Sequence, residues 1–387
     1  MKHPSRGRPR APLVGLILLV GGVGLQWALA RSPVLVERVF ARGVYPLLGG
    51  RLGCFTRLLP ISLGEGLVFA LLGWLAVVLW RIIRSPERRP RLAKLARRAF
   101  LATALLYLAF LLLWGLNYQR QPLAVSAGLD VRPSSRDDLR ALGAALITEA
   151  NEAREGLPED GAGVMRLVDG GLHALTRSEA GFCEAEVLHP VLAGCPVRPK
   201  PMLTSAMFSW LGVTGIYLPF TGEPNVNMTL PDPELPFAAA HEIAHQRGFA
   251  REDEANYLGY LACRLHPDPD FRYSGRLAAS VYAVNALTAL DRKAGERLEA
   301  GRSPGTRRDL AALLAWAERH RGPAERVSQR VNDAYLRSQG EAQGIESYGR
   351  VVDLLLAERR GQRDRPLPAG LSPHSGFPRC LFQAPPG

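Results

Sequence analysis

One stretch of the chain carries residues whose types and spacing are typical of a hydrolytic metal site. His241, Glu242 and His245 form the pattern H-E-x-x-H directly after three alanines, which are strong helix formers. Two histidines four residues apart lie one turn apart on the same face of a helix, so both imidazoles can bind one metal ion. Glu242 lies beside them, where it can take a proton from metal-activated water instead of binding the metal. The motif predicts a zinc (Zn2+) site with His241 and His245 as ligands and Glu242 as the catalytic base.

A catalytic zinc site needs a third protein ligand and an open position for water. Gly248, three residues after the second histidine, is a natural helix stop that lets the chain fold back toward the metal. Three acidic residues follow, Glu252, Asp253 and Glu254. Glu252 comes first on the next helix, and its pattern E-x-x-A-N resembles the segment that begins with the ligand glutamate in several zinc peptidases. Glu252 is therefore the favoured ligand, and Glu254 is its competitor. The acidic residues of this first helical turn that do not bind the metal would stabilise the helix through its dipole.

Three apolar segments precede the motif, and each is long enough to cross a bilayer as a helix. The first, residues 11–30, is an uncharged run of twenty residues between Arg10 and Arg31. The second covers residues 59–80 and carries Glu65 near one end, and the third, residues 99–119, is uncharged. The first segment also resembles a signal peptide, because Ala-Leu-Ala at its end is similar to a cleavage site. The sequence predicts a multi-pass membrane protein that is in contact with the lipid bilayer.

The distribution of charge predicts how the spans are oriented and argues against nucleic-acid binding. The formal net charge is +12, but residues 1–10 contribute +4 and residues 81–98 contribute +7. Little positive charge is left for a nucleic-acid footprint. Basic loops stay on the cytoplasmic side of a membrane. The N-terminus is therefore expected in the cytoplasm of a plasma-membrane protein, with everything after about residue 120 outside.

The remaining signals divide the chain into an anchor and one folded domain. Residues 31–58 are expected to form a bent outer loop close to the membrane. A short run of prolines, glycines and β-branched residues between 187 and 227 predicts a small sheet, and the segment after Pro236 reads as helical to about Arg360, with breaks near Gly248, Pro267 and Gly301. The predicted divisions are a cytoplasmic basic start at 1–10, a three-helix transmembrane region at 11–119, a metallopeptidase domain at 120–361 and a poorly ordered tail rich in proline and glycine at 362–387.

Three blocks of this sequence resemble a bacterial membrane-protein family known as domain of unknown function 3810. They are H-E-I-A-H-Q-R-G-F with its continuation to Asn256, the run G-I-Y-L-P-F-T-G-E-P-N-V-N at residues 215–227, and W-G-L-N-Y at residues 114–118. The resemblance covers the chain from the spans to about residue 357. It implies a zincin-like membrane protein with no established substrate. The expected fold is mainly α: three N-terminal transmembrane helices, then an α+β zincin-like extracytoplasmic domain with a small sheet and a helical C-terminal part.

Two further segments could serve the site. In zincin-like folds an edge strand before the active-site helix holds extended substrate by backbone pairing, and residues 213–220 occupy that place in the order. An ordinary core strand is the alternative. Downstream, Asn332, Tyr335 and Tyr348 lie in a helical stretch that resembles the family's C-terminal block. A tyrosine there could stabilise a developing oxyanion, although such a residue is more often packed with its hydroxyl satisfied.

The five cysteines form no C-x-x-C pair, which leaves a cysteine zinc site unsupported. Cys183 and Cys195 are the pair we expect to bridge if this region faces an oxidising compartment. An odd number of cysteines leaves the pairing open.

These observations predict a membrane-anchored zinc metallopeptidase that hydrolyses peptide or other amide bonds of a substrate outside the membrane. The alternative is a non-enzymatic membrane sensor or scaffold with a structural metal site, which a closed fourth ligand would favour. A transporter is disfavoured, because only Glu65 is ionisable within the spans and transport pathways need polar residues at depth.

Overall fold

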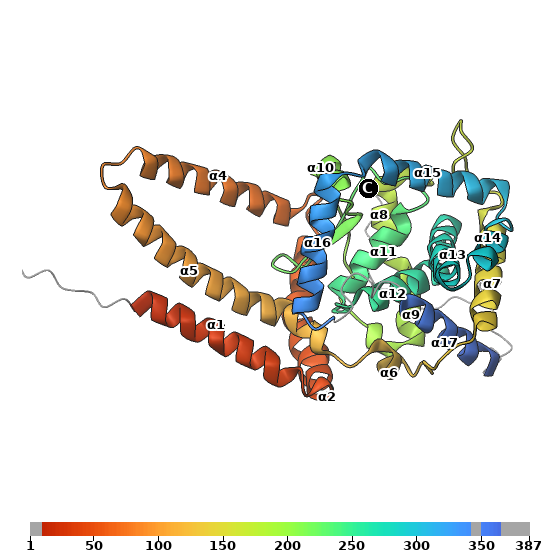
Figure 1. Ribbon diagram of the computed structural model, residues 1–387, viewed down its shortest axis with the longest axis horizontal. Coiled ribbons are helices and arrows are strands. Elements are labelled where there is room, and N and C mark those ends of the chain that lie inside the picture. The colour runs from red at the N-terminus through yellow and green to blue at the C-terminus, as the bar shows by residue number, and fades with distance from the viewer. Residues whose placement is uncertain (1–9, 342–349, 365–387) are drawn as a thin grey trace, which may run out of the picture.

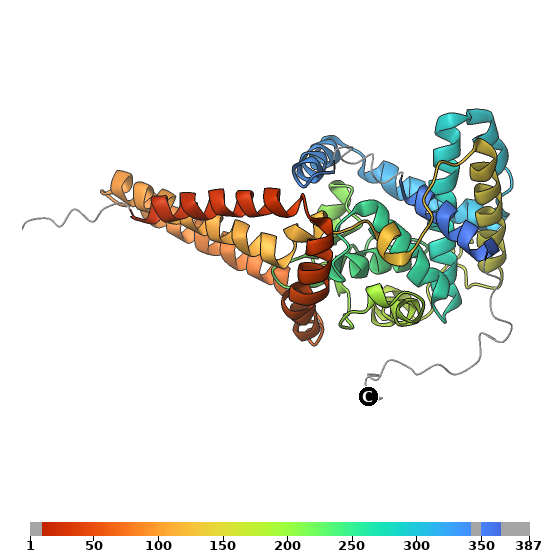
Figure 2. The same ribbon diagram turned by 90° about the horizontal axis from the view of Figure 1, so that it is seen from below.

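The fold was determined as a computed structural model that describes residues 10–341 and 350–364. Three long apolar helices extend side by side from one side of a helical domain (Figures 1 and 2), and they are α1 (Arg10–Leu29), α4 (Leu63–Ile83) and α5 (Arg88–Leu113). Each is long and apolar enough to cross a membrane, and nearly all of their surface is exposed. Three such helices near the N-terminus indicate membrane insertion.

The third of these helices differs from its prediction at both ends. It begins at Arg88, within the basic stretch, because Pro90 lies in the first helical turn, where a proline is tolerated. It ends at Leu113, and the chain continues as the 3-10 turn η3 (Gly115–Gln119), which is buried. The last residues assigned to the span therefore belong to the junction with the domain.

The connection between α1 and α4 is helical and lies across the ends of the long helices (Figure 2). It consists of α2 (Pro33–Leu35), the π-helical turns η1 (Val36–Val44) and η2 (Pro46–Gly50), and α3 (Arg51–Thr56). We call residues 33–56 the junction segment. One face of it is buried against residues 111–118, Tyr217, Ala250 and Leu336. Its exposed side is mostly apolar, with Arg38, Arg42 and Arg51 among the apolar residues.

The small sheet is mixed and has three strands, β1 (Lys200–Pro201), β2 (Gly215–Leu218) and β3 (Glu223–Val226). The strand order is β1-β3-β2, with β1 parallel and β2 antiparallel to β3. β2 is therefore an edge strand, which is one of the two possibilities considered for residues 213–220. It pairs with β3 from Gly215 opposite Val226 to Leu218 opposite Glu223.

Helices make up the rest of the domain and enclose its main core. Within this core α11, α12, α13 and α7 pack on one another. The helix breaks near Gly248, Pro267 and Gly301 occur where the sequence predicted them, and the predicted tail lies outside the described residues apart from the end of the last helix. The helices are α6 (Leu123–Ala127), α7 (Arg136–Arg154), α8 (Gly170–Arg177), α9 (Ala180–Leu188), η4 (Pro190–Leu192), α10 (Ser205–Trp210), α11 (Leu235–Gln246), α12 (Glu252–Leu265), α13 (Pro269–Leu290), α14 (Arg292–Glu299), α15 (Pro304–His320), α16 (Pro323–Ser338) and α17 (Val351–Asp364).

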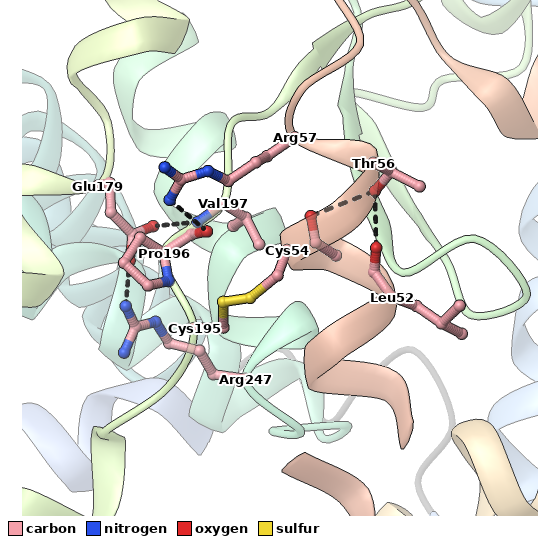
Figure 3. Close-up of a disulfide and its surroundings, with 10 residues drawn as sticks. Leu52, Cys54, Thr56, Arg57, Glu179, Cys195, Pro196, Val197 and Arg247 are labelled. Carbon is pink, nitrogen blue, oxygen red and sulfur yellow. Dashed lines mark hydrogen bonds and ion pairs between the residues drawn. A yellow bond between two sulfur atoms is a disulfide. The ribbon is translucent and has the colours of Figure 1, made fainter. Parts of the chain in front are cut away.

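A disulfide ties the junction segment to the domain (Figure 3). It joins Cys54 of α3 to Cys195, so the expected pairing of Cys183 with Cys195 is wrong. The physical reason is that α3 packs directly on residues 195–197. Arg57 donates a hydrogen bond to the carbonyl oxygen of Pro196 at 3.4 Å, and Cys54 thereby lies beside Cys195. Nearness in sequence gave the wrong partner.

Candidate metal centre

The helix α11 carries the H-E-x-x-H motif and is buried along nearly its whole length. Pro236 lies in its first turn, where the missing N–H costs no hydrogen bond. At the other end, the N–H of Phe249 bonds to the carbonyl of Ala244 and the N–H of Gly248 bonds to that of His245. This double closure, with Gly248 at φ +85°, is a Schellman motif. Gly248 therefore ends the helix as predicted and turns the chain back toward α12.

The turn brings one carboxylate onto the two imidazoles. Oε2 of Glu252 lies 3.3 Å from Nε2 of His241 and 3.6 Å from Nε2 of His245. One ligand atom from each of the three residues lies within 4.8 Å of the others. The imidazole rings of the histidines are 4.6 Å apart and perpendicular. Three residues predicted as ligands thus converge on a single point.

The competitor Glu254 does not take part in this cluster. Its Oε1 accepts a hydrogen bond from the backbone N–H of Leu123 at 2.7 Å and lies 3.5 Å from Arg251. Burial raises the pKa of Glu254 to about 7. Glu252 and Glu254 are two residues apart on α12, about 200° around the helix, so they face opposite directions. Glu254 therefore joins the start of α12 to the start of α6 and does not contact the histidines.

Burial and the convergence of charges determine the electrostatics of the cluster. Burial lowers the pKa of His245, but the Glu252 carboxylate outweighs this effect and raises the pKa to about 9. Burial by itself would raise the pKa of Glu252, yet the two imidazoles hold it well below its usual range. The group of three therefore contains a carboxylate that stays ionised and attracts positive charge. A bound divalent cation is the natural replacement for the protons on the imidazoles.

His245 is oriented by its other nitrogen and by an aromatic ring. Nδ1 of His245 lies 2.8 Å from the carbonyl oxygen of Phe249, which makes it the donor and leaves Nε2 free to face Glu252. The ring of Trp114 packs edge-on against the imidazole, with centroids 5.7 Å apart. Trp114 directly follows α5. The residue that follows the third apolar helix therefore contacts one of the three converging residues.

Glu242 is buried beside the cluster and lies against the edge strand. Its Oε2 has no hydrogen-bond partner, and burial raises its pKa to about 7. A Cβ atom at Gly215, the first residue of β2, would lie only 2.5 Å from Oε1 of Glu242. Only a glycine fits at this position. The carboxylate therefore lies directly under the start of the edge strand, where an extended chain could pair with β2.

One protein family matches this chain. The family described as "Protein of unknown function (DUF3810)" matches residues 40–356, which is most of the chain. The chain belongs to the DUF3810 family. No curated protein and no solved structure matches it.

The DUF3810 match includes the later part of the junction segment, which contacts both α11 and β2 through Tyr45. Tyr45 donates a hydrogen bond to the carbonyl oxygen of Gln246 at 2.8 Å, and its hydroxyl lies 3.2 Å from that of Tyr217. The helix α11 and the edge strand β2 are thus joined through a residue that precedes two of the apolar helices. No local sequence pattern indicates this contact.

A buried ion pair joins the junction segment to the turn after α11. Glu37 accepts two hydrogen bonds from Arg120, at 2.9 and 3.0 Å, and both residues are almost fully buried. Arg120 also donates to the carbonyl oxygen of Gly248 at 2.8 Å, and its guanidinium lies over the ring of Phe249. This pair was missed by sequence reasoning. Its one signal was an acidic residue, Glu37, among apolar neighbours in the connection between two spans.

The three downstream residues considered as possible contributors to the site differ in their position in the structure. Tyr335 lies on α16, and its ring packs edge-on against those of Tyr118 and Phe110 at 5.9 and 6.4 Å. Burial raises the pKa of its hydroxyl. Asn332 lies on the same helix, partly exposed. Tyr348 lies outside the described residues.

Proposed function

We propose that this DUF3810 member is a membrane-anchored zinc metallopeptidase whose metal is held by His241, His245 and Glu252. The observation that supports the proposal best is the spacing of the three ligand atoms. Ligands about 2.0–2.1 Å from a tetrahedral zinc ion lie about 3.4 Å from one another. The distances of 3.3 and 3.6 Å from Glu252 to the two imidazole nitrogens fit this requirement. The donor set of two imidazoles and one carboxylate is typical of catalytic zinc.

The number of side-chain ligands supports a catalytic site over a structural one. Within residues 10–341 and 350–364, no fourth histidine, cysteine or acidic side chain joins the group of three. Structural zinc sites have four protein ligands, whereas catalytic sites have three and an open position. This favours a hydrolase over the alternative of a sensor or scaffold with a structural metal. When bound, a zinc ion supplies Lewis-acid chemistry that makes water a nucleophile at neutral pH.

Each protein group then has a defined role. Glu242 accepts a proton from the attacking water and returns it to the leaving amine. Its raised pKa of about 7, caused by burial, suits a group that must both take and give a proton near neutral pH. The free edge of β2 offers backbone groups to an extended peptide beside Glu242. Trp114 and the carbonyl oxygen of Phe249 keep His245 in place.

We expect the metal content to decide between the two acidic candidates for third ligand. The full-length protein, purified in detergent and measured by plasma mass spectrometry, should contain about one zinc per chain. His245→Ala and Glu252→Ala should each lose it, because two ligands do not hold zinc tightly. Glu254→Gln is the matched control and should keep the metal, since Glu254 faces Leu123 and Arg251. Zinc that persists in Glu252→Ala but disappears in Glu254→Gln would reverse the assignment. A folded wild-type protein that contains no metal would contradict the proposed metal site.

We further propose that the domain lies outside the cytoplasm. The basic stretch of residues 81–98, where α4 ends and α5 begins, favours the cytoplasmic side. This puts the junction segment and the domain together on the other side. The bridge between Cys54 and Cys195 joins these two regions, and such bonds persist in oxidising compartments. The distribution of basic residues and the disulfide bridge therefore both support an orientation with the domain outside the cytoplasm.

The bridge gives a direct test of this orientation. A protease site inserted at residues 130–134, an exposed stretch between α6 and α7, separates Cys54 from Cys195. After cleavage of intact cells or spheroplasts by added protease, the two fragments should migrate together on a gel without reductant and separate when it is added. A Cys54→Ser variant should separate in both gels. Protection of the site from external protease, with cleavage only after lysis, would contradict the proposed side.

A further inference from the structure

The helix α16 has three distinct faces around its axis. At 100° per residue, Ala324, Val327, Val331 and Ala334 fall within an arc of about 80°. Val327 is 56% exposed and Val331 is 64% exposed. Arg326, Arg330 and Arg337 fall together on another exposed face, about 110° away. The third face carries Leu336 and Gln339, which are buried against the rest of the protein.

Contacts at the C-terminal end of α16 show where its apolar face lies. Tyr335 falls between the apolar face and the buried face, and its ring packs edge-on against Phe110 in the last turn of α5 at 6.4 Å. Gln339 accepts a hydrogen bond from Gln26 of α1 at 3.2 Å, and its carbonyl accepts one from Gln119. The apolar face is therefore on the side of α16 that adjoins the apolar helices, and the arginines are on the side away from them.

Both views of the molecule agree with this placement. α16 lies at the junction between the apolar helices and the domain, and it runs across the direction of those helices (Figures 1 and 2). A second apolar group lies near the start of α4. The turn between β2 and β3 packs on α3 through the hydrogen bond from Thr56 to Thr221, and it carries Phe220, which is 47% exposed.

We propose that α16 is an interfacial helix whose apolar face docks into the headgroup region of the bilayer that surrounds α1 and α5. Helices of this kind lie in the plane of a membrane with valine, leucine or aromatic residues on one side and basic residues on another. The lipid surface is the occupant, because the apolar face is continuous with helices long enough to cross a membrane. The ring of Tyr335 packs edge-on against that of Tyr118, Tyr118 packs against Trp114, and Trp114 contacts His245. Two aromatic side chains therefore link α16 to His245.

Site-specific fluorescence in lipid nanodiscs tests this surface. Val331→Cys and Arg330→Cys are adjacent exposed positions on different faces of α16, so they form a matched pair. Each full-length variant is labelled with the environment-sensitive dye NBD, with wild type carried through labelling to measure background from native cysteines. The discs contain phosphatidylcholine and phosphatidylglycerol, with or without lipids that carry a nitroxide near the headgroup. Val327→Cys and Arg326→Cys repeat the comparison one turn away.

The dye at positions 331 and 327 should be quenched by nitroxide lipids at least twofold more than the dye at 330 and 326, with emission shifted to shorter wavelength. Equal, weak quenching at all four positions would overturn the proposal and leave α16 as a solvent-exposed helix. Strong quenching at 330 and 326 alone would also overturn it. The measurement needs neither zinc nor turnover, so it is independent of the proposed peptidase activity.

Discussion

Replacing Glu242 with glutamine should abolish peptide hydrolysis while zinc remains bound. The amide has nearly the same size as the carboxylate but cannot accept a proton from water, and general-base catalysis contributes on the order of 10²–10⁴ in rate. Turnover is measured with quenched fluorescent peptides of mixed sequence, chosen as those that the zinc-loaded wild-type protein cleaves. Zinc content should stay near one per chain, because Glu242 is not among the three converging residues.

The control for Glu242→Gln is a measurement of its thermal stability. Glu242 is buried and its Oε2 has no hydrogen-bond partner, so the glutamine should leave the melting temperature close to that of wild type. Loss of activity together with zinc and fold would indicate a structural role instead. Cleavage at the wild-type rate by Glu242→Gln would exclude Glu242 as the base.

Removing the carboxylate of Glu37 should destabilise the protein by about 3–5 kcal/mol, because it leaves Arg120 buried without a counterion. Glu37 is 2% exposed and Arg120 is 5% exposed. Thermal unfolding of Glu37→Ala in detergent, followed by tryptophan fluorescence, should show a clear fall in melting temperature. Zinc affinity should fall too, since Arg120 holds the carbonyl of Gly248 at the turn between the ligands.

The matched control removes the other partner of Glu37. Arg42 lies 3.0 Å from the same carboxylate, but its side chain is 54% exposed. Exposed ion pairs contribute about 0–1 kcal/mol, so Arg42→Ala should change the melting temperature little. Equal losses in both variants would argue against the buried pair as the main support of this turn.

The pH dependence of this support has a definite sign. Burial raises the pKa of Glu37, but hydrogen bonds and charge from Arg120 and Arg42 outweigh it, and the pKa lies below its ordinary value. The stabilisation is therefore complete above the pKa of the unfolded chain and is lost as the pH falls through the lower pKa of the folded state. Wild type and Glu37→Ala should converge in stability in acid.

Local sequence patterns predicted those parts of the fold and the site that depend on residues close together in the chain. The helix of His241 and His245 follows from its alanines and from Gly248, whose positive φ only glycine adopts easily. The first two apolar helices follow from uninterrupted hydrophobic length. Glu252 was favoured over Glu254 from order along the chain, and the turn at Gly248 brings Glu252 beside the imidazoles.

The contacts that join distant parts of the chain were not predictable in the same way. Tyr45 meets Gln246, and Cys54 meets Cys195 across 141 residues. Neither pairing leaves a trace in periodicity or composition, because each depends on how α3 and α11 pack in three dimensions. The role of Trp114 was also hidden, since an aromatic residue at the end of a span is ordinarily explained by the membrane interface.

The hydrogen bond from Tyr45 to the helix α11 also bears on how the protein is synthesised. Its partner, Gln246, lies 201 residues later in the chain. At translation rates of 5–20 residues per second, the ribosome needs about 10–40 s to produce the second partner after the first. During that interval the face of the junction segment that is buried in the folded protein lacks Tyr217, Ala250 and Leu336 to cover it. Biosynthesis of this protein therefore includes a waiting period in which the lipid surface or a chaperone must shield residues 33–56.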